Sequence, residues 1–282
     1  MKKIISIPFI AIFVISFFSG FKHITESIEP ENTGDDTLFP SLKAVLIVGP
    51  QEGNTASAIE KMKKIAAFFK KKGVEVESYY DDKAVWENIK DAAKDADFFI
   101  YSGHGTSLGE DGKTGGLCLS ARISSKEITE ELELGENAVV IFKSVCMGAG
   151  SSASDHEDIG IEEAETRVSD YSMPFFELGA SCYYANNMGG GCLNFLRCFF
   201  TGETVKACYE KTTQTWAEIE ISKQYKFDNT KQISIASTNF GGTSTVTTYK
   251  NGVKTVEERP SVKSYTIAFV ANVDFTIDDL IE

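Results

Sequence analysis

A histidine and a cysteine, each followed by small residues, are the residues of this chain best suited to joint chemistry. His104 lies between two glycines in "FFIYSGHG", and Cys146 precedes a short small-residue run in "VVIFKSVCMGAG". A thiol must lose its proton before it attacks a carbonyl carbon, and an imidazole that titrates near neutrality can take that proton. The pair therefore indicates nucleophilic catalysis, with Cys146 as nucleophile and His104 as general base.

Each residue also has a structural explanation, since a buried cysteine is usually a small core residue and a lone histidine is more often structural. Their shared context favours catalysis, because both follow apolar runs that are typical of buried strands, and glycines come after both. In an open α/β sheet, functional groups gather at the carboxyl ends of the strands. If the two strands are neighbours, His104 and Cys146 lie close together, and the backbone amides of Gly105 and Cys146 can hold an oxyanion.

The elements that would position these residues alternate regularly along the first half of the chain. Apolar runs and alternating patterns predict strands at 42–49, 74–80, 97–105 and 137–146. Helical spacing of apolar residues predicts helices between them, at 54–73, 84–96 and 124–134. This order predicts an α/β fold, a three-layer α/β/α sandwich with a mainly parallel sheet.

The second half of the chain is less regular. A long polar and acidic loop is expected at 147–170, followed by a short helix, a strand and a glycine-rich turn within 173–191. The segment 192–225 has a helical pattern with a break near Gly202, and 231–238 is typical of a strand.

The C-terminal part has a strong hairpin signal. Asn251 and Gly252 lie between alternating β-forming residues, which predicts a C-terminal β-hairpin extension. The segment 264–275 is expected to form another strand.

The first 20 residues are typical of a secretory signal peptide, with two lysines, an apolar run and small residues at Ser19 and Gly20. The alternative is an uncleaved membrane anchor, because the cleavage site lacks a clean small-residue pattern. We predict an exported protein (periplasmic, cell-surface or extracellular) with a polar leader at 21–40. No stable membrane association is expected once the signal is removed.

The composition of the chain indicates which ligands and partners to expect. The formal net charge is −13, and an acidic surface repels phosphate backbones, so nucleic-acid binding is not expected. Six cysteines in an exported chain permit disulfides, but their spacing leaves the pairing open. The spacing of cysteines and histidines matches no zinc-binding pattern, and the glycine-rich stretches at 49–55 and 189–191 match no nucleotide-binding one. Neither a metal nor a cofactor is expected.

The two segments that end at His104 and Cys146 resemble those of the caspase–gingipain–clostripain superfamily of cysteine peptidases (clan CD). In that family an apolar strand ends in His-Gly, and in caspases the histidine lies about 50 residues before the cysteine; here they lie 42 residues apart. The resemblance covers 42–235 and implies a caspase-like fold. It also implies His104 as general base, Cys146 as nucleophile, and the amides of Gly105 and Cys146 as the oxyanion hole.

The chain departs from the family next to the cysteine. Metacaspases and clostripain-like members have an acidic residue two positions before it, where this chain has Ser144, and the Gln-Ala-Cys of true caspases is Ser-Val-Cys here. The sequence therefore leaves open which type of residue is recognised immediately before the cleaved bond (position P1). For a basic P1, the countercharge would come from Asp155, Asp158 or Asp170, unless these acids simply belong to a solvated loop.

A second set of residues would line the P1 pocket. Tyr183, Tyr184 and Asn186 lie at the expected carboxyl end of a strand. The alternative for the two tyrosines is packing against the sheet edge.

The sequence thus predicts an exported cysteine endopeptidase that cleaves peptide bonds through a Cys-His dyad and an acyl-enzyme, with self-processing expected in the long loop. We expect a signal peptide (1–20), a polar leader (21–40), a caspase-like peptidase domain (41–238), and a hairpin and terminal strand packed on that domain (239–282). The alternatives are a catalytically inactive caspase-like binding module and a thiol amidase that acts on a small molecule.

Overall fold

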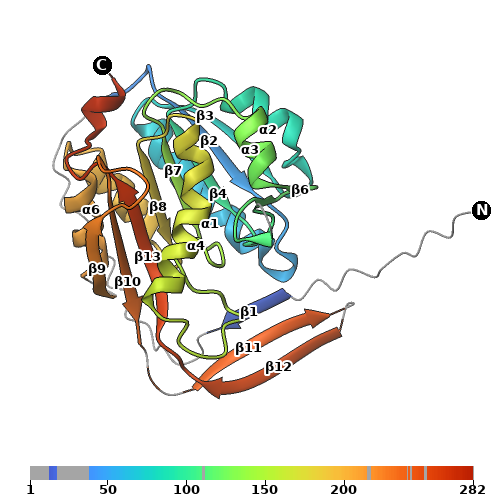
Figure 1. Ribbon diagram of the computed structural model, residues 1–282. Coiled ribbons are helices and arrows are strands. Elements are labelled where there is room, and N and C mark those ends of the chain that lie inside the picture. The colour runs from blue at the N-terminus through green and yellow to red at the C-terminus, as the bar shows by residue number, and fades with distance from the viewer. Residues whose placement is uncertain are drawn as a thin grey trace, which may run out of the picture.

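An eight-stranded sheet forms the centre of the protein, with strand order β3-β2-β4-β7-β8-β13-β10-β9 (Figure 1). The computed structural model describes residues 13–17, 38–109, 112–214, 217–239, 241, 243–250 and 253–281. The strands of the central sheet are β2 (Lys43–Val48), β3 (Glu75–Tyr80), β4 (Phe98–Ser102), β7 (Val139–Lys143), β8 (Cys182–Asn186), β9 (Glu218–Gln224), β10 (Gln232–Thr238) and β13 (Ser264–Ala271).

Most of this sheet is parallel. Strands β3, β2, β4, β7 and β8 pair in parallel, whereas β13, β10 and β9 join through antiparallel pairs. The expected α/β class with a mainly parallel sheet is confirmed. A two-stranded ribbon of β5 (Leu117–Cys118) and β6 (Arg122–Ile123) lies outside it.

Helices cover both faces of the sheet. The six α-helices of the described part are α1 (Thr55–Lys71), α2 (Trp86–Ala93), α3 (Ser125–Glu131), α4 (Ile161–Glu177), α5 (Gly191–Phe199) and α6 (Val205–Thr213). Buried residues of α2, α3 and α4 belong to one apolar cluster, and those of α1, α5 and α6 to another. The molecule therefore has two cores, one on each side of the sheet.

The alternation of side chains along each strand produces these two cores. In β2, Val45 and Ile47 belong to the cluster under α2, α3 and α4, whereas Leu46 and Val48 belong to the opposite one. Every residue of β4 and β7 is buried. A strand buried on both faces has a continuous apolar run, so both strands can be predicted from the sequence.

Two predictions of local structure were wrong. The loop expected at 147–170 ends at Gly160, because α4 begins at Ile161 and buries residues at helical spacing behind an acidic surface. The end of the predicted helical segment 192–225 is instead β9, an edge strand that pairs with β10. Its mostly exposed side chains and alternating Glu-Ile pattern explain the strand.

The C-terminal hairpin is confirmed as β11 (Thr243–Lys250) and β12 (Val253–Pro260). Its Asn251-Gly252 turn lies outside the described residues. Within the predicted signal peptide, β1 (Phe13–Phe17) pairs antiparallel with β11, so these three strands form a separate sheet (Figure 1). The remainder of 1–20, and 21–37 of the leader, lie outside the described residues. Among the helices that the structure describes, none combines the length and apolar character needed to cross a membrane.

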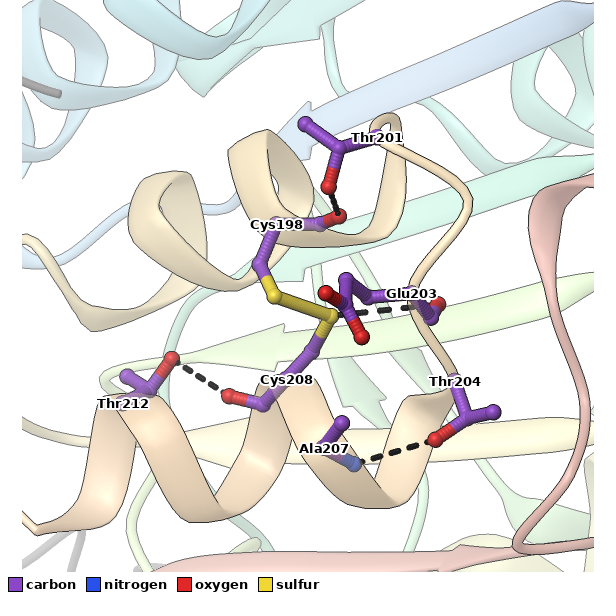
Figure 2. Close-up of a disulfide and its surroundings, with 7 residues drawn as sticks. All are labelled: Cys198, Thr201, Glu203, Thr204, Ala207, Cys208 and Thr212. Carbon is purple, nitrogen blue, oxygen red and sulfur yellow. Dashed lines mark hydrogen bonds between the residues drawn. A yellow bond between two sulfur atoms is a disulfide. The ribbon is translucent and has the colours of Figure 1, made fainter. Parts of the chain in front are cut away.

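A disulfide joins Cys198 of α5 to Cys208 of α6 (Figure 2). Figure 2 also shows Thr204, whose hydroxyl accepts a hydrogen bond from the Ala207 amide and so caps α6. The four free cysteines are Cys118, Cys146, Cys182 and Cys192.

Reduction of the disulfide is expected to lower the free energy of unfolding by about 2–3 kcal/mol, because a cross-link restricts the unfolded chain. Chemical denaturation of oxidised and reduced protein measures the difference. A Cys198→Ser/Cys208→Ser double variant should behave as the reduced protein does. Equal stability of the oxidised and reduced forms would contradict a stabilising role for this bond.

Candidate active site

The two strands that precede His104 and Cys146 are neighbours in the sheet. Strands β4 and β7 pair in parallel, with Tyr101 opposite Phe142, so the loops that follow them leave the same edge. A Cβ atom on Gly105 would lie 1.8 Å from the carbonyl oxygen of Cys146 and 2.9 Å from its Cβ. The two loops therefore touch, and residue 105 has no room for a side chain. His104 and Cys146 are both partly exposed at this contact.

The turn that carries Cys146 has an unusual backbone. Ser144 and Met147 have positive φ angles of 56° and 66°, a conformation that non-glycine residues adopt rarely. The Ser144 amide donates to the Asn186 carbonyl at 3.1 Å, and the Met147 amide donates to the Ser151 carbonyl at 2.9 Å. These bonds hold a conformation that costs of order 1 kcal/mol per residue, and such residues cluster at functional sites.

Two backbone amides remain available where the loops meet. Within the described part of the chain, the N–H groups of Gly105 and Cys146 donate to no other residue. Backbone amides without an internal acceptor can stabilise an oxyanion that develops beside them. Gly105 contacts Cys146, so both amides belong to the place where the two loops meet.

Two buried tyrosines, which the sequence did not single out, hold the His104 loop. The Tyr101 hydroxyl lies 3.1 Å from the His104 carbonyl, to which it donates, and accepts from the Cys118 amide at 3.0 Å. The Tyr171 hydroxyl of α4 accepts from the Thr106 amide at 2.7 Å. In the sequence both tyrosines look like ordinary core residues, because each occupies a buried position of its strand or helix.

Tyr171→Phe is expected to lower kcat by about 10-fold to 10²-fold, since the loop that positions His104 would lose its support. It should also lower the free energy of unfolding by about 1–3 kcal/mol, because the buried Thr106 amide would have no acceptor. Steady-state kinetics and denaturation measure both effects. Tyr79→Phe is the matched control, since that hydroxyl binds Glu77 on the edge strand β3. A kcat equal to that of the control would contradict this positioning role.

Burial lowers the pKa of His104 below its ordinary value of 6.5, and the positive charge of Arg122 on β6 adds to this effect. The ring is therefore neutral at neutral pH. Neutral imidazole is the form that accepts a proton, so the environment favours a general base.

The pH profile of kcat/KM should reflect this environment. Protonated His104 cannot accept the thiol proton, so activity should fall as the pH decreases through a pKa below 6.5. Arg122→Gln removes a positive charge and should move this acid limb to higher pH. Lys64→Gln, on the exposed side of α1, should leave it in place. An acid limb that is the same with and without Arg122 would rule out His104 as the titrating group.

Tyr183 and Tyr184 pack inside the sheet, which was the structural alternative for these residues. Both are completely buried. The Tyr183 hydroxyl donates to the Gly148 carbonyl at 2.8 Å, and Tyr184 stacks on Phe195 with ring centroids 4.0 Å apart. Asn186 is also buried and donates to the Tyr184 hydroxyl at 2.7 Å. Tyr183 thus supports the turn that follows Cys146.

The three candidate acids have different partners and lie in different elements of the structure. Asp155 forms an ion pair with Arg167 of α4 at 2.9 Å. Asp158 accepts from the Gly160 amide at 2.9 Å and from the Tyr265 hydroxyl at 3.3 Å. Asp170 belongs to α4 rather than to the loop. The first two acids therefore order the segment after Cys146.

The sequence also missed Lys143, the last residue of β7, which is 4% exposed. Its amine contacts the Ser144 hydroxyl at 3.4 Å, and burial lowers its pKa. The apolar run around Lys143 could have indicated burial. In the described part of the chain, no three histidine, cysteine or acidic side chains cluster closely enough to hold a metal ion.

The fold and the site together define an α/β protein with a cysteine and a histidine at adjacent strand ends. Searches against protein-family models and against curated proteins give no match to this sequence.

Proposed function

We propose that the protein is a cysteine endopeptidase of the caspase-like type. The main support is the contact of Gly105 with Cys146, which brings the His104 loop against the cysteine at one edge of the sheet. The neutral imidazole, the partly exposed thiol and the two available amides add to this support. His104 and Cys146 follow neighbouring parallel strands of the sheet, which the proposal requires.

In this proposal, His104 takes the proton of the Cys146 thiol as the sulfur attacks the scissile carbonyl carbon. The amides of Gly105 and Cys146 hold the oxyanion of the tetrahedral intermediate. As the C–N bond breaks, His104 gives its proton to the leaving amine. His104 then takes a proton from the water that attacks the thioester, and as the C–S bond breaks it returns this proton to the Cys146 sulfur.

Two further features belong to the proposal. The disulfide between α5 and α6 is typical of exported proteins and supports export.

Self-cleavage is proposed between Asp155 and Gly160, where His156 and Glu157 are exposed. Wild type and Cys146→Ala that give the same single band on a denaturing gel would argue against self-cleavage.

Peptide-library profiling with Cys146→Ala as control tests the function. The wild type should cleave a subset of peptides at defined positions, and the variant should leave every peptide intact. Intact peptides in both samples would contradict the proposal and favour a small-molecule amidase or a binding protein. Cleavage that survives in the variant would assign the activity to a contaminant.

A further inference from the structure

A cleft between α3 and α4 opens close to the proposed nucleophile. Its volume is about 290 Å³, and its walls include Thr114 from the loop after His104, Ser125 from α3, and Met173 from α4. The Thr114 hydroxyl lies 3.9 Å from the sulfur of Met147, the residue after Cys146. A ligand that contacts Thr114 in the cleft would therefore lie close to the turn that carries Cys146.

A buried hydroxyl at the wall of the cleft lacks a hydrogen-bond partner in the described part of the chain. Ser125 is 8% exposed, and its hydroxyl makes no hydrogen bond within the described part of the chain. Pro174 has no N–H, so the Asp170 carbonyl cannot accept the usual helical bond from position 174. A Cβ on Gly115 would lie 2.3 Å from the Ser125 hydroxyl and 3.5 Å from that carbonyl, so both groups lie beside Gly115. A buried polar side chain without a protein partner is uncommon and is available to bind a ligand or a water molecule.

The charges of the cleft favour a cation. The Asp170 carboxylate is partly buried, and no lysine or arginine of the described residues forms an ion pair with it. Lys126 pairs with Glu130 at 3.6 Å. Lys113 is then the remaining cation of the lining, opposite two carboxylates, Asp170 and Glu177. Burial raises the pKa of Asp170, although the charge of Lys113 and the Thr114 amide oppose this shift.

We propose that this cleft binds the side chain of a lysine or arginine in the peptide substrate. The head group would donate to the Asp170 carboxylate, the Asp170 carbonyl and the Ser125 hydroxyl, which matches the several donors of a guanidinium or ammonium group. The aliphatic stem would lie against Met173 and Pro174. Because neither His104 nor Cys146 lines the cleft, we assign it to a substrate residue other than the one whose carbonyl is attacked.

This assignment rests on the proposed peptidase function, but binding can be measured without catalysis. N-acetyl-arginine amide is titrated into Cys146→Ala by calorimetry or NMR, with N-acetyl-norleucine amide as the uncharged probe. We expect the arginine probe to bind and the norleucine probe not to bind. Adding Asp170→Asn should weaken binding by about tenfold or more, the usual effect of losing a charged hydrogen bond. Glu162→Gln, which removes an exposed charge from the same helix, should have no effect.

Library profiling then links the cleft to the substrate. Wild type should prefer lysine or arginine at one position other than P1, and Asp170→Asn should lose that preference while it still cleaves. Ser125→Ala is a second, milder variant and should reduce the preference in part. Equal binding of both probes, or a preference that Asp170→Asn retains, would overturn the assignment. No cleavage by wild type, with arginine binding intact, would instead reject the peptidase function alone.

Discussion

Cys146→Ala is expected to lower kcat/KM for peptide cleavage by about 10⁴-fold or more, because no other group can form the acyl-enzyme. Cys146 is partly exposed at the end of a strand, so loss of its sulfur should leave the fold and the melting temperature nearly unchanged. Activity and melting temperature measured on the same preparation separate a catalytic role from a structural one.

Cys118→Ala is the matched control. Cys118 is also a free, partly exposed cysteine, and it shares contacts with Tyr101 near the His104 loop. Burial raises the pKa of its thiol, although the charge of Arg122 opposes this, so it is a weak nucleophile. Activity should survive this change. If Cys118→Ala lost activity and Cys146→Ala kept it, the nucleophile would be Cys118 and not Cys146.

His104→Ala is expected to lower kcat/KM by about 10²-fold to 10⁴-fold, the usual contribution of a general base. The remaining activity should depend more steeply on hydroxide, because bulk solvent must then deprotonate the thiol. The acid limb that His104 produces in the wild type should disappear from the profile. A pH series of kcat/KM on both proteins measures all three effects.

His156→Ala controls for the loss of an imidazole. His156 is exposed, and its ring contacts Arg259 of β12 rather than the active site. Its replacement should change kcat/KM by less than about twofold. If His104→Ala kept both the rate and the acid limb of the wild type, the general base would have to be another group.

The contact between the His104 and Cys146 loops could be predicted because it depends on a simple rule. Two strands buried on both faces have continuous apolar runs, and parallel neighbours end at the same edge. The sequence of β4 and β7 therefore located His104 and Cys146 without any knowledge of side-chain packing. Their pairing in the sheet confirms that part of the reasoning.

The surroundings of the site could not be predicted in the same way. The sequence suggests a loop at Asp170 because the acidic residues of α4 obscure its apolar face, which packs on the sheet in the structure. Tyr183 and Tyr184 lie on β8, and a strand pattern does not show whether other elements cover these side chains. In the structure the turn after Cys146 contacts Tyr183, and α5 packs on Tyr184. Tyr171 supports the loop of Thr106 from 65 residues away, and sequence spacing carries no information on such a contact.

The measurement closest to the central claim is mass spectrometry of intact protein treated with a peptidyl acyloxymethyl ketone that carries a sequence selected from the library. We predict one equivalent of label on Cys146, none on Cys118, Cys182 or Cys192, and slower labelling in His104→Ala by about 10²-fold. Cleavage of the selected sequence by a protein whose Cys146 stays unlabelled would contradict the account. Equal labelling rates with and without His104 would contradict it as well.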